Sequence, residues 1–197
     1  MVTPLVIWAV TVLIYGAFWA WYVGFGHKIS ALDLNRYMSC IEQASRGEEF
    51  VESYRDFFAN DDGKEFFMVN VLHLKHPKRE SAQLLSKYTS VFVPKLMRKA
   101  GHPYFVGLGQ AKNLENLNCE SDDEWTSTAL MRYRSRKDLG EMLVDTIGQE
   151  HHGYKLAALE KTFAFPASAK LNLGSVRLVV ALVLALIAAS MHIGLIS

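Results

Sequence analysis

The stretch Phe66–Leu74, with the sequence FFMVNVLHL, decides the fold of this chain. It is a short and almost wholly apolar run that follows the turn-forming residues 60–63 (NDDG), a pattern typical of a β-strand. Side chains alternate along a strand, so these residues divide between two faces. The two sets are Phe66, Met68, Asn70 and Leu72, and Phe67, Val69, Val71 and His73.

Helical periodicity precedes this strand. In residues 30–62, apolar side chains recur every three or four positions, first up to Ile41 and then from Phe50, and Gly47 separates the two stretches. Their polar faces carry charges of both signs. We therefore expect this amphipathic segment to cap the domain rather than to lie on a bilayer.

Further strands and helices follow as far as Pro166. The expected elements are a helix over residues 81–100, strands over 104–110 and 125–133, a helix that begins at Arg136 and bends at Gly148, and a strand over 161–165 that Pro166 ends. Ser135 is the expected N-cap of the second helix, with Asp138 at its third position.

Together with the first strand, these elements have the order β-α-β-β-α-β, which is that of the ferredoxin-like unit. The predicted fold class is α+β, with a ferredoxin-like domain over residues 65–166. One face of its four-stranded antiparallel sheet is covered by the two helices. The other face also needs a cover, so we expect a second copy of the sheet and hence a homodimer.

Two uncharged apolar segments flank this domain. Residues 5–25 include 18 apolar residues, residues 178–196 include 16, and every Lys, Arg, Asp and Glu lies between Lys28 and Arg177. About 20 apolar residues span the hydrocarbon core of a bilayer. The expected organisation is a transmembrane helix over residues 5–26, a linker over 167–176 and a second transmembrane helix over 177–196.

The basic residues next to these segments predict their orientation. Lys28, Arg36, Lys170 and Arg177 all lie on the side of the central domain, and neither tail carries a base. The positive-inside rule then places the domain in the cytoplasm and both termini outside, as in a two-pass protein of a bacterial inner membrane. A cleaved signal peptide is the competing interpretation of the first segment, but residues 1–4 lack its basic region.

Small residues recur every four positions in both apolar segments. They are Gly16, Ala20 and Gly24 in the first and Ala181, Ala185 and Ala189 in the second. This spacing lets two helix backbones approach closely, which favours pairing of the helices within one chain or between chains. The alternative is that Gly and Ala are simply frequent in such helices.

Composition and motifs exclude several classes of function. A net charge of +1 argues against a nucleic-acid-binding protein. Cys40 and Cys119 are far apart, form no metal motif and are expected to be reduced in the cytoplasm. The sequence contains no HExxH, CxxC or P-loop pattern, so we predict neither a metal nor a cofactor.

Several short stretches resemble one known superfamily. They are residues 69–72 (VNVL), 124–125 (EW), 132–139 (RYRSRKDL) with Met142, 151–152 (HH) and 157–160 (AALE). Through them, residues 66–165 resemble the dimeric α/β-barrel superfamily, which includes small cofactor-free monooxygenases and isomerases, and are most similar to an uncharacterised bacterial branch of it. The resemblance implies a barrel made by two copies, with a cavity, and it implies no particular reaction.

Two polar residues on the predicted strands are candidates for a site. Asn70 either points into the barrel and orients a ligand carbonyl or hydroxyl, or bonds a neighbouring backbone or its dimer mate, because a buried amide is costly unless its hydrogen bonds are met. Arg132 either holds an anionic group with bidentate geometry or is a surface base at a strand end.

Histidines and tyrosines supply the other candidates. His151 and His152 are adjacent, so on a helix they point about 100° apart and cannot form a paired metal site. One of them is a candidate base near neutral pH, with His102 and Tyr104 as possible neighbours, and the alternative is a pair on the helix surface. Tyr88 is either a cavity hydroxyl or a core aromatic.

Two functions therefore remain open. In the first, a membrane-anchored dimer binds a small apolar or aromatic molecule and acts on it by acid–base chemistry without a cofactor. Its catalytic candidates are Asn70, His151 and His152, and its ligand-binding candidates are Tyr88, His102, Tyr104 and Arg132. In the second, the protein is a non-catalytic membrane interaction module that dimerises through the barrel. A chamber of roughly 300 Å³ or more would favour the first.

Overall fold

The computed structural model describes residues 3–26, 28–44, 47–115, 117, 124–147 and 149–196. Cys119, the predicted bend at Gly148 and most of the loop before the third strand lie outside these residues. The chain divides into two compact units. One consists of Met1–Phe25 with Ala169–Ser197, and the other of Gly26–Ser168.

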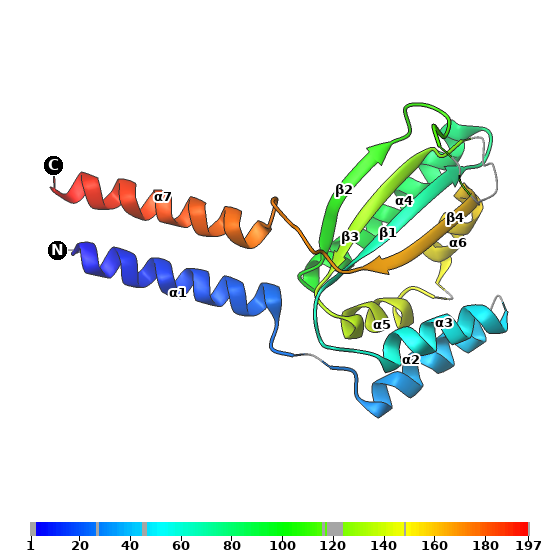
Figure 1. Ribbon diagram of the computed structural model, residues 1–197, viewed down its shortest axis with the longest axis horizontal. Coiled ribbons are helices and arrows are strands. Elements are labelled where there is room, and N and C mark those ends of the chain that lie inside the picture. The colour runs from blue at the N-terminus through cyan, green and yellow to red at the C-terminus, as the bar shows by residue number, and fades with distance from the viewer. Residues whose placement is uncertain are drawn as a thin grey trace. The chain divides into compact units, whose positions relative to one another are not determined.

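The larger unit is built on a four-stranded antiparallel sheet (Figure 1). Its strands are β1 (Phe66–Leu74), β2 (His102–Leu108), β3 (Ser127–Tyr133) and β4 (Leu159–Ala167), in the spatial order β2-β3-β1-β4. The apolar run Phe66–Leu74 is thus β1, one of the two central strands, with the bounds that the sequence predicts. An α+β fold with a four-stranded antiparallel sheet is confirmed.

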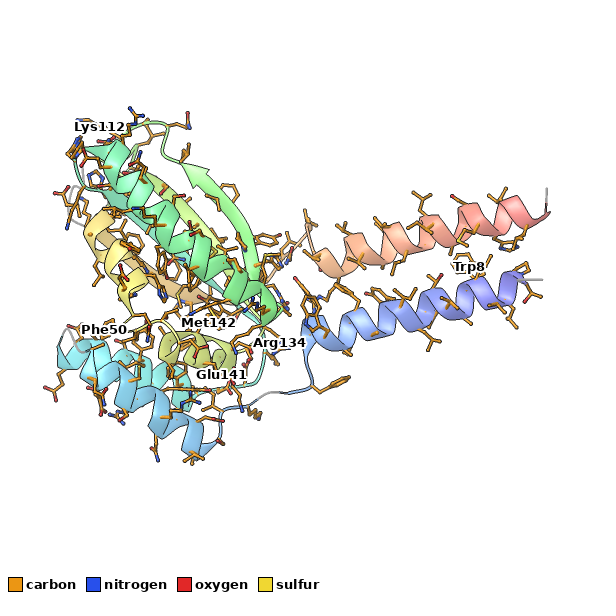
Figure 2. The ribbon with its side chains drawn as sticks, turned by 180° about the vertical axis from the view of Figure 1, so that it is seen from behind. Trp8, Phe50, Lys112, Arg134, Glu141 and Met142 are labelled. Carbon is orange, nitrogen blue, oxygen red and sulfur yellow. The ribbon has the colours of Figure 1, made fainter. Side chains whose placement is uncertain are left out.

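Helices cover one face of this sheet, as the views from both sides show (Figures 1 and 2). They are α4 (Lys78–Arg98), α5 (Arg136–Val144) and α6 (Glu150–Ala158), so two helices stand where the sequence predicts one with a bend. The predicted cap of α5 is confirmed, because the Ser135 hydroxyl accepts a hydrogen bond of 3.1 Å from the Asp138 backbone N–H.

The predicted amphipathic segment forms two helices, α2 (Ala31–Gln43) and α3 (Glu48–Ala59), which add a further layer beside α5. The core of this layer contains Tyr37, Ile41 and Phe58 from α2 and α3, and Leu139 and Met142 from α5. The segment therefore lies on the helix side of the domain and leaves the opposite face of the sheet without a cover of its own.

Several predicted bounds differ from the structure: α4 covers residues 78–98 rather than 81–100, β2 covers 102–108 rather than 104–110, and β3 begins at residue 127 rather than 125. The last strand differs most, and it begins at Leu159 rather than at Lys161. Strand β4 does not end before Pro166 but runs on to Ala167, with Pro166 opposite Met68 of β1. Because β4 is an edge strand, one side of its backbone makes no bonds within the sheet, and the missing N–H of a proline is tolerated there.

The two faces of the sheet differ in what covers them. Phe66, Met68 and Leu72 pack into clusters with residues of the helices. The face on the other side, called the open face below, includes Phe67, Val69, Val71 and His73 of β1, Thr128, Leu130 and Arg132 of β3, Phe105 of β2, and Lys161, Phe163 and Phe165 of β4. The three outer phenylalanines Phe105, Phe163 and Phe165 are 52%, 49% and 48% exposed, so none of the described helices of this unit covers them.

The smaller unit is a pair of antiparallel helices, α1 (Pro4–Val23) and α7 (Val176–Ile196). Both are long and apolar enough to cross a membrane. The helices pack on each other within one chain. Gly16, the first residue of the predicted row in α1, lies outside this contact, since an added Cβ there would meet nothing within 4 Å. Ile7 and Tyr22 of α1 and Ala188 of α7 are buried, and many apolar residues of both helices are exposed.

Candidate functional site

Asn70 belongs to the helix-covered side of β1, together with Met68 and Leu72. Its side-chain amide donates hydrogen bonds to the backbone carbonyls of Met68, at 3.0 Å, and of Ala129, at 3.2 Å. This is the backbone alternative of the sequence analysis. The amide ties β1 to β3 and does not reach the open face.

Arg132 is held by the protein itself. Its side chain is 2% exposed, and Nε and Nη2 lie 2.7 and 2.6 Å from Oε2 of Glu65. Nη1 donates to the Ala100 carbonyl at 2.6 Å. These bonds join the end of β3 to the residues before β1 and β2, so the guanidinium acts as an internal tie.

The structure brings predicted site residues together in two places. His102 lies opposite Arg132 in the pairing of β2 with β3, and Tyr88 lies beside His151. The ring centroids of Tyr88 and His151 lie 6.5 Å apart with nearly parallel planes, and Phe92 stacks on Tyr88 at 5.3 Å. The His151 Nε2 is buried and has no hydrogen-bond partner among the described residues. An orphaned polar atom in the interior calls for a water, a ligand or a catalytic role.

Two further tyrosines surround this pair. Tyr133, at the end of β3, is 4% exposed and stacks on Phe66, with ring centroids 5.2 Å apart. Burial raises the pKa of the Tyr133 hydroxyl, and the nearby Tyr88 and Tyr54 raise it further. Burial also raises the pKa of Tyr88, with a smaller effect of Tyr54. We call Tyr54, Tyr88, Tyr133 and His151 the phenol–imidazole cluster.

The chemistry of this cluster is that of neutral hydrogen-bond donors in an apolar setting. With raised pKa values, the phenols of Tyr88 and Tyr133 keep their protons at neutral pH, and each can donate to an oxygen atom. Tyr54 and Tyr133 were not predicted as site residues. Their aromatic character fits a core position equally well, and only the fold brings α3, α4, α6 and the end of β3 together.

The other predicted residues lie elsewhere. His102 Nδ1 is 3.0 Å from the Pro103 carbonyl oxygen, and Tyr104 packs edge-on against Phe67, with centroids 5.1 Å apart. His152 lies in the first turn of α6, where its backbone N–H donates to the Gln149 carbonyl at 3.0 Å. The structure thus places neither His102 nor Tyr104 on the helices that carry Tyr88 and His151.

One end of the open face carries an aromatic and charged group that the sequence analysis did not select. Trp125 meets Phe163 edge to face at 5.2 Å, and the Lys161 ammonium lies 5.0 Å from the centre of the Trp125 ring. His73 Nε2 is 3.7 Å from a carboxylate oxygen of Glu160, while its Nδ1 is buried without a partner among the described residues.

Two of the hollows on the surface of the described residues contain none of the candidate residues. One, of about 350 Å³, is lined by Glu48, Glu49, Glu52, Ser53 and Asp56 of α3. The other, of about 440 Å³, is lined by Lys78, Leu108, Gly109, Gln110, Ala111, Lys112, Glu124, Trp125 and Thr126. The described residues contain no group of three or more His, Cys, Asp or Glu side chains arranged for a metal ion.

Comparisons with known proteins support the fold alone. No family model matches the chain, and no curated protein matches it. The structure of the RPA0582 protein, a protein of unknown function from Rhodopseudomonas palustris, is similar with a TM-score of 0.51 and 20% identity, over 66% of this chain and 98% of that chain. The structure of methylated RPA0582 protein gives a TM-score of 0.51 and 21% identity, over 67% and 97%. A third of this chain has no counterpart in either.

The tie through Arg132 leads to a stability prediction. Glu65→Gln leaves a buried guanidinium without its carboxylate, which we expect to destabilise the protein by about 3–5 kcal/mol. Arg132→Met with Glu65→Gln removes both charges and should recover part of that loss. Urea unfolding of the purified chain in mild detergent, followed by circular dichroism, measures both. An unchanged midpoint for Glu65→Gln would show that the ion pair does not hold Arg132.

Proposed function

We propose that this chain is a membrane-anchored protein that dimerises through the open face of its sheet and binds a small lipophilic molecule. In this proposal the larger unit is a ferredoxin-like domain of the dimeric α/β-barrel type. The observation that carries it is the open face, an apolar and aromatic sheet surface that no described helix of its own unit covers.

The surfaces of α1 and α7 support the membrane anchor. A helix that is apolar all round is buried in a large core or in a bilayer. These two helices are not core helices of this chain, since only 11% and 6% of their most apolar windows are buried. Leu13, Leu182 and Leu186 are 72%, 61% and 69% exposed on their outer sides, which suits contact with lipid.

The distribution of charge supports the orientation. Lys28, Arg36, Lys170 and Arg177 lie at the domain ends of the two helices, and no base lies at the other ends. The proposed topology has both termini outside and the domain in the cytoplasm of a bacterial cell, with two crossings of the inner membrane.

The size and symmetry of the open face support a second copy as its cover. Four strands of this length at their usual spacing form a plane of roughly 25 by 19 Å. The side chains that project from this plane increase its accessible area. A stable interface buries about 800 Å² on each partner, and the open face approaches that size. The same apolar surface on two copies is self-complementary, as a two-fold dimer requires. The membrane helices add to this, since they confine both copies to one bilayer.

The phenol–imidazole cluster supports the ligand. Its phenols and its buried imidazole nitrogen offer hydrogen bonds within aromatic walls, which fits a planar apolar molecule with one or two oxygen atoms. A membrane anchor keeps such a site next to the phase in which lipophilic molecules dissolve. The buried Nε2 of His151 is the atom placed to accept a proton from the bound molecule, without a cofactor.

One observation favours a second function, that of a non-catalytic interaction module. Neither of the two hollows described above is lined by a member of the phenol–imidazole cluster. If the cluster holds only water, the domain serves to dimerise the chain, and the protein binds another membrane protein without catalysing a reaction. The ligand experiment below separates these two functions.

The membrane anchor predicts a topology. Alkaline phosphatase fused to either end should be active in a bacterial host, because both termini are expected outside. The full chain should stay in the membrane fraction at alkaline pH, and protease should cleave the domain in inverted vesicles but not in intact spheroplasts. Release of the chain by alkaline washing would contradict the anchor.

The open face predicts the dimer. Phe163→Glu places a charge in the proposed interface and should weaken the dimer at least tenfold, which is about 1.4 kcal/mol. Native mass spectrometry of the full chain in mild detergent measures this. Leu156→Glu is the matched control, since Leu156 is similarly exposed at 42% but lies on α6. If Phe163→Glu remains as dimeric as the control, the open face is not the interface.

The cluster predicts which side chains retain the ligand. The same spectra of the wild-type dimer should show an added small-molecule mass, and Tyr88→Phe and His151→Leu should reduce its occupancy at least tenfold. Tyr154→Phe is the control, because the Tyr154 hydroxyl donates to Glu150 instead, at 2.8 Å. A wild-type dimer without added mass, together with a folded domain, would favour the interaction module.

A further inference from the structure

A hydrogen bond between side chains joins α1 and α7. The indole Nε1–H of Trp8 donates to Nδ1 of His192 over 3.2 Å. The hydroxyls of Thr11 and Ser190 bond carbonyls of their own helices, Ile7 at 2.8 Å and Leu186 at 2.9 Å. The bonds of Thr11 and Ser190 each stay within one helix. The bond from Trp8, in contrast, joins the two helices, close to the start of α1 and the end of α7.

The chemistry of this bond depends on the charge of the imidazole. An indole nitrogen can only donate, so His192 must accept through an unprotonated Nδ1 and is therefore neutral, with its proton on Nε2. A protonated imidazole has two N–H donors and no acceptor. Protonation of His192 therefore removes the bond and places two donors against each other.

The described residues of α1 and α7 contain no carboxylate that would compensate for that charge. The described part of α1, Pro4–Val23, contains no Asp, Glu, Lys, Arg or His, and its titratable side chains are Tyr15 and Tyr22. The charged side chain of α7 is Arg177, at the opposite end of the helix, where the Tyr15 hydroxyl bonds its carbonyl at 3.4 Å. A charged His192 would find no carboxylate on either helix.

The position of the bond gives protons access to it. Trp8 lies about one turn from the start of α1 and His192 about one turn from the end of α7. In the proposed topology this is the boundary region of the membrane on the side that holds both termini. Histidine is also the side chain that ordinarily changes charge between pH 5 and 8.

We propose that Trp8 and His192 form a proton-sensitive clamp that holds the free ends of the two membrane helices together and opens when the outer side becomes acidic. The side on which the clamp senses protons rests on the proposed topology, whereas the clamp itself does not. Opening separates the outer ends of α1 and α7 while the apolar contact around Ile7 and Ala188 loosens.

The test uses the full chain in detergent micelles, labelled with ¹⁵N for NMR of the tryptophan indoles. The Trp8 signal is identified by its loss in Trp8→Phe. In the wild type it should move between pH 8 and pH 5 along a single titration curve. His192→Gln provides a carbonyl acceptor that does not titrate, and with it the Trp8 signal should stay in place. Ser190→Ala, a polar loss on the same helix, should titrate like the wild type.

A second readout follows the distance between the helix ends. Nitroxide labels on cysteines introduced at Leu5 and Ile193, in a background without Cys40 and Cys119, should show spin–spin broadening that falls at least twofold on acidification. With His192→Gln the broadening should persist at pH 5. A Trp8 signal that ignores pH, or one that titrates equally in His192→Gln, would overturn the clamp.

Proteoliposomes separate failure of the clamp from failure of the topology. With the vesicle interior held at pH 8, external acid should release the broadening only in those molecules whose termini face outward, as scored by protease access to the domain. If the clamp titrates in micelles but responds to acid on the side of the domain, the clamp stands and the proposed orientation is wrong.

Discussion

The structure depends on an imbalance between the two faces of one sheet. A four-stranded sheet must cover both faces unless one of them is polar. In this chain α4, α5 and α6 cover one face, and α2 and α3, which might have covered the other, add a layer beside α5 instead. The remaining surface carries Phe105, Phe163 and Phe165, so its exposure in a single copy is the strongest physical argument for an assembly.

Local chemistry explains why much of the fold was predictable. The bounds of β1 follow from an uninterrupted apolar run between turn residues, and the start of α5 follows from a hydroxyl and a carboxylate three positions apart. Both signals are contained in a few neighbouring residues. The end of β4 was not predictable in this way, because whether a strand tolerates Pro166 depends on whether it lies at an edge, which is a property of the whole sheet.

The candidate site was predictable only in part, and the reason is the same. Tyr88 and His151 were selected for their chemistry, and the packing of α4 against α6 brings them together. Arg132 and Asn70 were selected on equal grounds, yet Glu65 and the carbonyls of Met68 and Ala129 already satisfy them. A polar residue in an apolar run indicates that its side chain makes a hydrogen bond. The sequence alone does not say whether the partner of that bond belongs to the protein or to a ligand.

The proposed membrane anchor and the proposed dimer make consistent demands on each other. Two copies that are tethered in the same bilayer meet at a high effective concentration, which lowers the affinity that the sheet surface itself must supply. A two-fold dimer in one membrane must also have its axis along the membrane normal, since any other axis would invert one copy. The sheet interface and the helix pair are then subject to the same symmetry, and a change in the packing of α1 against α7 occurs twice in each dimer. In a dimer of this kind, a change in conditions on one side of the membrane would therefore act on two equivalent pairs of α1 and α7 at the same time.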